Sequence, residues 1–163
     1  MGDELDGQAS RAPTPDDLSR LCKALNEAGA KYVLVGGLAV NYWGRQRATE
    51  DVDFLVDPSP DNVRRIKRGM EVLADNAARD VRDGDVAECT VVRVVDEITV
   101  DLMARIGEIE FSNADAVMAD VNGVVIPIAA LTTLIETKRG MRPQDQTDLR
   151  FLLRRQEQRD VPR

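Results

Sequence analysis

Residues 31–57 read KYVLVGGLAVNYWGRQRATEDVDFLVD, and this stretch decides the fold. Residues 31–35 are rich in branched and aromatic side chains, which favours a buried strand. The strand stops at Gly36-Gly37, after which residues 38–44 have helical character. Residues 51–57 form a second apolar run that predicts another strand, so the paired glycines lie where the first strand passes into a helix.

Helices are predicted on either side of these two strands. Thr14 and Pro15 are suited to the N-cap and first position of a helix that ends at Gly29, and apolar residues at helical spacing give it one buried face. The remaining predicted elements are a helix from residue 59 to Leu73, a hairpin of Thr90–Val95 and Ile98–Met103, a strand at 125–128 after the turn at Asn122-Gly123, and helices at about 129–139 and 145–156. This order predicts an α+β or mixed α/β domain with one small mixed sheet flanked by helices.

The composition restricts the chemistry. The chain has 163 residues and no histidine, which excludes Ser-His-Asp and Cys-His catalysis and histidine-ligated zinc. Cys22 and Cys89 lie far apart, and both are expected to be small buried side chains. The formal net charge of -7 counts against a dedicated nucleic-acid-binding protein. Carboxylate, metal and backbone-amide chemistry remain.

The length fits one domain. We expect a flexible tail at residues 1–13, a single domain at 14–156 and a second flexible tail at 157–163. No apolar run approaches the roughly 20 residues that cross a bilayer, and the acidic start lacks the apolar region of a secretory signal. These features favour a cytoplasmic protein without a membrane partner.

Several residues are candidates for a site, and each also has a structural interpretation. Asp51 and Asp53 point to the same face of a strand and suit Mg²⁺, but acidic residues are also ordinary at solvated strand ends. Gly36-Gly37 offers bare amides to an anion, or makes a plain tight turn. Asp101 lies inside an apolar strand, where it either joins a site or faces solvent. Lys138 is either a lysine that binds a phosphate group or an ordinary surface residue near the end of a helix.

Together these pieces resemble a known signature. Val35-Gly36-Gly37, a gap of thirteen residues and Asp51-Val52-Asp53 are similar to the motif of the DNA polymerase beta-like nucleotidyltransferase superfamily, and Asp101 in ITVDLM matches its third acidic residue. The segments GRQRATEDVDFLV and LIETKRGMRPQDQTDLRFL resemble the small AbiEii-toxin-like and minimal nucleotidyltransferases. The resemblance covers residues 31 to about 152. The chain departs from it at Gln144, where relatives often carry lysine, and at Gly37, which replaces a serine.

The resemblance implies transfer of a nucleoside monophosphate from a nucleoside triphosphate, with ATP as the first choice, to a hydroxyl group. It implies two Mg²⁺ ions held by Asp51, Asp53 and Asp101, with Asp101 also accepting the hydroxyl proton. The implied nucleotide-binding residues are Gly36, Gly37, Arg45, Arg47, Thr49 and Lys138.

The acceptor stays open between RNA, a protein and a small molecule such as a cationic antibiotic. The basic run Arg64, Arg65, Lys67 and Arg68 is either an RNA-facing edge or a solvated helix face. The resemblance also suggests a partner protein in a toxin–antitoxin pair. Two alternatives remain: a non-catalytic module of the same fold that binds a partner protein, and a domain whose acidic residues are scattered, with Asp101 more than about 10 Å from Asp53.

Overall fold

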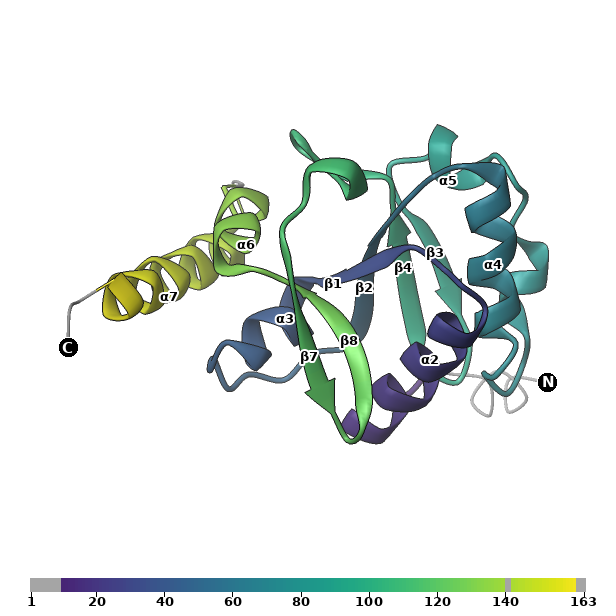
Figure 1. The fold of residues 1–163 in the computed structure, drawn as a ribbon, viewed down its shortest axis with the longest axis horizontal. Coiled ribbons are helices and arrows are strands. Elements are labelled where there is room, and N and C mark those ends of the chain that lie inside the picture. The colour runs from purple at the N-terminus through teal and green to yellow at the C-terminus, as the bar shows by residue number, and fades with distance from the viewer. Residues whose placement is uncertain (1–9, 140–141, 161–163) are drawn as a thin grey trace.

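A computed structural model describes residues 10–139 and 142–160 and has a mixed sheet at its centre (Figure 1). The six strands lie in the order β3-β4-β2-β1-β8-β7. In chain order they are β1 (Tyr32–Val35), β2 (Asp51–Val56), β3 (Val92–Val95), β4 (Thr99–Met103), β7 (Ala116–Val121) and β8 (Val124–Ala129). The short strands β5 (Arg105–Ile106) and β6 (Ile109–Glu110) form a separate pair. The architecture confirms the predicted mixed α/β class.

Helices flank the sheet. They are α2 (Pro15–Glu27), α3 (Gly36–Tyr42), α4 (Pro60–Met70), α5 (Asp85–Glu88), α6 (Leu131–Thr137) and α7 (Pro143–Asp160), with the 3-10 turns η1 (Ala77–Asp80) and η2 (Phe111–Asn113). The predicted start of α2 is confirmed, because the Thr14 hydroxyl accepts a hydrogen bond from the amide of Asp17 while the Asp17 carboxylate accepts one from the amide of Thr14. This reciprocal cap satisfies two amide groups that the helix itself leaves free.

The alternation of side chains along the strands separates an apolar face from a polar one. Tyr32 pairs with Val56 and Leu34 with Phe54 across β1 and β2, so these four side chains share one face. The hydroxyl of Tyr32 donates a hydrogen bond to Asn26 of α2, which identifies this face as the one that α2 and α4 cover. The carboxylates of β2 therefore lie on the other face.

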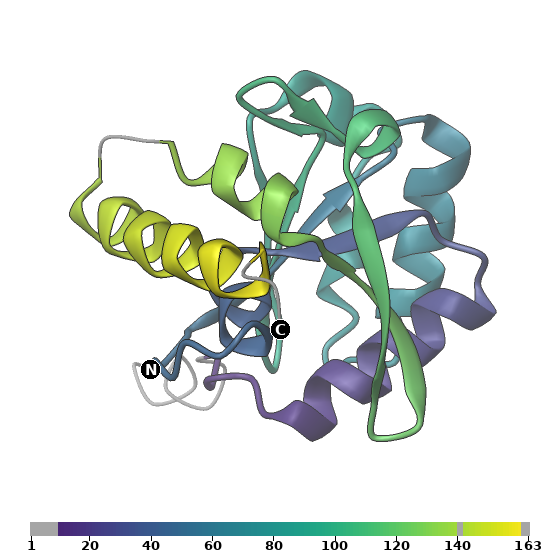
Figure 2. The ribbon, with the colours of Figure 1, turned by 60° about the vertical axis from the view of Figure 1, so that its left-hand side comes forward.

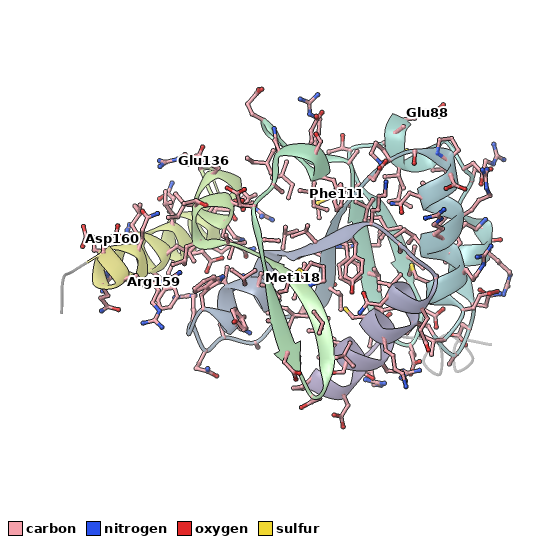
Figure 3. The ribbon with its side chains drawn as sticks, viewed as in Figure 1. Glu88, Phe111, Met118, Glu136, Arg159 and Asp160 are labelled. Carbon is pink, nitrogen blue, oxygen red and sulfur yellow. The ribbon has the colours of Figure 1, made fainter. Side chains whose placement is uncertain are left out.

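Helices α6 and α7 pack against each other at one end of the molecule (Figure 2). The indole of Trp43, directly after α3, donates a hydrogen bond to the carbonyl of Ala129 where β8 ends. Arg159 lies at the far end of α7 (Figure 3). Its guanidinium is 5.2 Å from the centre of the Trp43 ring. These contacts tie α7 to α3. Among residues 10–139 and 142–160, none of the helices has the length and apolar character needed to cross a membrane.

Three expectations differ from the structure. Residues 116–121, for which the sequence predicts no strand, form the edge strand β7, whose strand pattern is hidden because Ala119 is its single buried residue. Cys89, expected to be buried, is exposed because it follows the single short turn α5, of which only Val86 is buried; Cys22 is buried as predicted. Helix α7 continues to Asp160, beyond the expected end at residue 156. The domain limits stay a prediction, and residues 1–9 and 161–163 of the expected tails, like Gly140 and Met141, lie outside the described residues.

Candidate functional site

A row of charged residues crosses the polar face of the sheet. Asp53 on β2 pairs with Asp101 on the parallel strand β4, and Asp101 pairs with Arg93 on the antiparallel strand β3. On the other side, Asp53 pairs with Val35, the last residue before Gly36. Because directly opposite residues in a sheet lie about 5 Å apart, this register gathers groups from four strands into one row.

The structure brings Asp51, Asp53 and Asp101 together, and we call them the acidic cluster. One carboxylate oxygen from each lies within 4.8 Å of the others, which contradicts the scattered arrangement. Burial, and then the charges of Asp101 and Asp51, raise the pKa of Asp53 to about 7. Burial also raises the pKa of Asp51, although Arg93 opposes the shift. Three clustered hard oxygen ligands whose mutual repulsion a cation would relieve fit Mg²⁺.

Arg93 is part of this cluster's surroundings, and the sequence analysis missed it. Its guanidinium donates to both carboxylate oxygens of Asp101, from Nε and Nη2 at 2.9 Å each, and from Nη2 to Asp51 at 3.1 Å. These contacts raise the pKa of Arg93 above its ordinary value. The only signal in the sequence was its place in the predicted hairpin, opposite Asp101.

The two glycines are required by the close approach of the acidic cluster and the following loop. Gly36 has a φ of +70°, and a Cβ there would lie 2.0 Å from a carboxylate oxygen of Asp53. A Cβ on Gly37 would lie 2.6 Å from the methyl group of Thr49 and 3.0 Å from the guanidinium of Arg47. The serine of relatives therefore does not fit at Gly37 unless the side chains of Thr49 and Arg47 move.

The predicted cationic residues converge on one buried carboxylate, that of Asp148 in α7, whose side chain has no exposed surface. Lys138 Nζ and Arg47 Nη2 each lie 3.1 Å from Asp148 Oδ2, and Arg45 Nε lies 2.9 Å from Asp148 Oδ1. Lys138 is buried and also lies 3.5 Å from Asp145. Burial works to raise the pKa of Asp145, but a hydrogen bond from Arg142 and the charge of Lys138 outweigh it and hold this pKa below its ordinary value.

Two adjoining cavities contain the acidic cluster and part of the cationic set. One, of about 360 Å³, is lined by Gly36, Gly37, Arg47, Arg93, Lys138, Arg142, Gln144 and the acidic cluster, among others. The second, of about 370 Å³, shares Gly37, Arg47, Asp51, Asp53 and Gln144 with the first and adds Thr49. Arg45 lines neither cavity and lies behind them against Asp148. Of the predicted site residues, Arg45 alone is therefore placed away from the acidic cluster's cavities.

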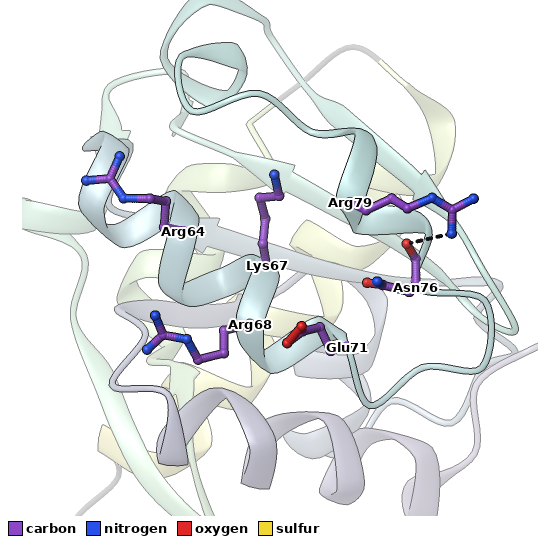
Figure 4. A pocket seen from close by; sticks show the side chains of 6 residues that line it. All are labelled: Arg64, Lys67, Arg68, Glu71, Asn76 and Arg79. Atoms are coloured by element: carbon purple, nitrogen blue, oxygen red, sulfur yellow. Dashed lines mark hydrogen bonds between the residues drawn. The ribbon is translucent and has the colours of Figure 1, made fainter.

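The basic run on α4 forms a separate hollow of about 300 Å³ (Figure 4). Arg64, Lys67 and Arg68 line it, and it shares no lining residue with the cavities of the acidic cluster. Part of its charge is neutralised locally, because Arg64 lies 2.7 Å from Asp83. Helix α4 covers the opposite face of the sheet, so the basic run is not an extension of the acidic cluster's site.

Comparison with known proteins agrees with this geometry. The family model described as "Nucleotidyl transferase AbiEii toxin, Type IV TA system" matches residues 19–138. The fold is similar to the crystal structure of an antigenic nucleotidyltransferase-like protein from Paracoccidioides brasiliensis, with a TM-score of 0.59 and 13% sequence identity over 90% of this chain and 78% of the other. No curated protein matches the sequence.

Proposed function

Because the chain belongs to the nucleotidyl transferase AbiEii toxin family of type IV toxin–antitoxin systems, we propose that it is a Mg²⁺-dependent enzyme that transfers a nucleoside monophosphate from a nucleoside triphosphate to a hydroxyl group. The observation that supports this proposal most strongly is the acidic cluster itself. Three carboxylates from two strands, with one oxygen of each within 4.8 Å of the others, line a cavity together with Gly36 and Gly37 at the start of α3.

In this reaction the acceptor oxygen attacks the α-phosphorus, the bond from that phosphorus to the bridging oxygen breaks, and pyrophosphate leaves with the electron pair. Asp101 takes the hydroxyl proton. Asp51, Asp53 and Asp101 would hold two Mg²⁺ ions, which when bound neutralise charge on the phosphates and on the attacking and leaving oxygens. Gly36 and Gly37 donate amide hydrogen bonds to the phosphate chain.

The cationic residues position the triphosphate. Lys138 and Arg47 line the cavity and neutralise phosphate charge, while Asp148 behind them fixes their direction. Thr49 packs against Gly37 and so holds the loop that carries Arg47. Arg45 does not line the cavity but forms an ion pair with the same carboxylate, Asp148, and its direct contact with nucleotide stays a prediction.

The reaction is tested with each of the four nucleoside triphosphates, labelled at the α- or the γ-phosphate. Acceptors are the protein itself, total RNA, a partner-protein extract and a panel of aminoglycosides. Nucleotidyl transfer places the α-label, and never the γ-label, in the acceptor. We expect Asp53→Ala to abolish incorporation and Asp80→Ala, a change at an exposed aspartate, to leave it unchanged.

The alternative is a module of the same fold that binds a partner protein without catalysis. Thermal unfolding with Mg²⁺ and ATP separates the two, since a ligand at 100 times its dissociation constant adds about 2.7 kcal/mol of stability. A protein that shows neither label transfer nor a nucleotide-dependent shift of its unfolding temperature would be such a module. The labelled product that forms identifies the acceptor and the preferred nucleoside triphosphate.

A further inference from the structure

The guanidinium of Arg93 donates hydrogen bonds to the carboxylate oxygens that would coordinate a divalent cation. Its guanidinium binds both oxygens of Asp101 and one oxygen of Asp51, with all three distances between 2.9 and 3.1 Å. Nη2 serves both carboxylates and therefore lies between them. A Mg²⁺ ion at about 2.1 Å from the same oxygens would meet this nitrogen, so the ion and the observed guanidinium position exclude each other.

The side chain is free to leave. It is 56% exposed, whereas its partner Asp101 is 7% exposed, so the buried carboxylate is fixed and the guanidinium reaches it from the solvent side. Asp101 and Asp51 would otherwise stand beside Asp53 with their charges uncompensated on this side of the cluster. The buried cation of the same cavity, Lys138, is held by Asp145 and Asp148. Arg93, which is exposed and pairs directly with Asp51 and Asp101, is therefore the cation that a metal ion can replace at low cost.

We propose that Arg93 is the resident counter-cation of the acidic cluster in the metal-free protein, and that divalent metal binding displaces it toward the mouth of the cavity. This inference rests on the proposed metal binding by the acidic cluster. Metal alone must compete with the guanidinium for Asp101. A triphosphate arriving with the metal offers the displaced guanidinium new anionic oxygens, so that metal and nucleotide bind cooperatively and bare metal binds weakly.

The test measures Mn²⁺ binding through the loss of the free-ion electron paramagnetic resonance signal, with and without a non-hydrolysable ATP analogue. Arg93→Gln removes the competing charge, and Arg93→Lys keeps the charge but cannot bind both oxygens of Asp101. Arg105→Gln is the control, because Arg105 is an exposed arginine that lies 3.8 Å from Glu110 on the separate β5–β6 pair. Circular dichroism verifies that each variant is folded.

We expect Arg93→Gln to bind Mn²⁺ about tenfold more tightly than the unmodified protein when nucleotide is absent, Arg93→Lys to fall between them, and Arg105→Gln to be unchanged. The gain in Mn²⁺ affinity on adding the analogue should be smaller in Arg93→Gln. In EDTA the unfolding temperature of Arg93→Gln should fall, and Mn²⁺ should restore it. Unchanged or weaker Mn²⁺ binding by Arg93→Gln overturns the inference. If every protein binds Mn²⁺ equally, only the inference about Arg93 fails; if none binds it, with or without analogue, the proposed function fails too.

Discussion

Replacing Asp53 by asparagine should stabilise the metal-free protein, and more so as the pH rises. Burial and the neighbouring carboxylates raise the pKa of Asp53 from 3.8 to about 7 in the folded chain. The folded state therefore binds this proton more tightly than the unfolded state. Stability from this group is greatest below pH 4 and is lost as the pH rises toward 7. Each pKa unit corresponds to about 1.4 kcal/mol, so the loss between pH 5 and pH 7 is at most ~3 kcal/mol.

Asparagine does not titrate, so the free energy of unfolding of Asp53→Asn, relative to the unmodified protein, should rise by up to ~3 kcal/mol from pH 5 to pH 8. Urea unfolding in EDTA at both pH values measures this difference. Asp80→Asn, at an exposed position, is the control and should show no such trend. Saturating Mg²⁺ should remove the advantage, because it stabilises only the ionised cluster. An Asp53→Asn difference that is the same at pH 5 and pH 8 would refute the repulsion argument.

Three further predictions concern the surroundings of the cluster. Gly36→Ala should abolish the stabilisation by Mg²⁺ and ATP, because its Cβ would lie 2.0 Å from a carboxylate oxygen of the acidic cluster. The matched control is Gly123→Ala, which should keep that stabilisation, because Gly123 also has a positive φ, +83°, but has open space around it. Asp148→Asn should lower the free energy of unfolding, measured by urea denaturation, by about 3–5 kcal/mol, because it removes the charge of a buried carboxylate that pairs with the buried Lys138. A change below about 1 kcal/mol, which is typical of an exposed ion pair, would contradict the role of Asp148 as a buried counter-charge. Arg159→Gln should alter the fluorescence of Trp43, the single tryptophan, with less than about 1 kcal/mol of lost stability, and an unchanged spectrum would mean that the end of α7 is not docked there.

The elements predicted correctly are those whose signal is local. Residues 32–35 and 51–56 form strands because branched side chains are buried on both faces of a central sheet. The cap at Thr14 needs only residues three positions apart. Strand β7 escaped prediction because five of the six side chains in AVMADV are not buried, and its pairing with β8 is what makes it a strand.

The residues of the site also differ in whether a local sequence signal predicts them. The spacing between Gly36-Gly37 and the pair Asp51 and Asp53 can be recognised in the sequence, because a single helix and loop separate the two motifs. The position of Arg93 does not, because its contact with Asp101 depends on the register of the hairpin, and one residue of slip would turn Arg93 to the other face. Its function as a counter-charge therefore becomes visible only with the strand pairing.

Asp148 explains why cations predicted to bind nucleotide are held by the protein itself. Lys138 and Arg47 come from segments about 90 residues apart along the chain. The segment LIETKRGMRPQDQTDLRFL contains both Lys138 and Asp148, but the sequence does not show that Arg47 meets the same carboxylate. Both also line the cavity that contains the acidic cluster, so Asp148 holds two cations of this cavity in place. A lysine ammonium has three donors and an arginine guanidinium five, so contact with Asp148 leaves donors for phosphate oxygens. Side chains fixed in this way lose little conformational entropy when a triphosphate binds, which makes the buried carboxylate a positioning element of the site.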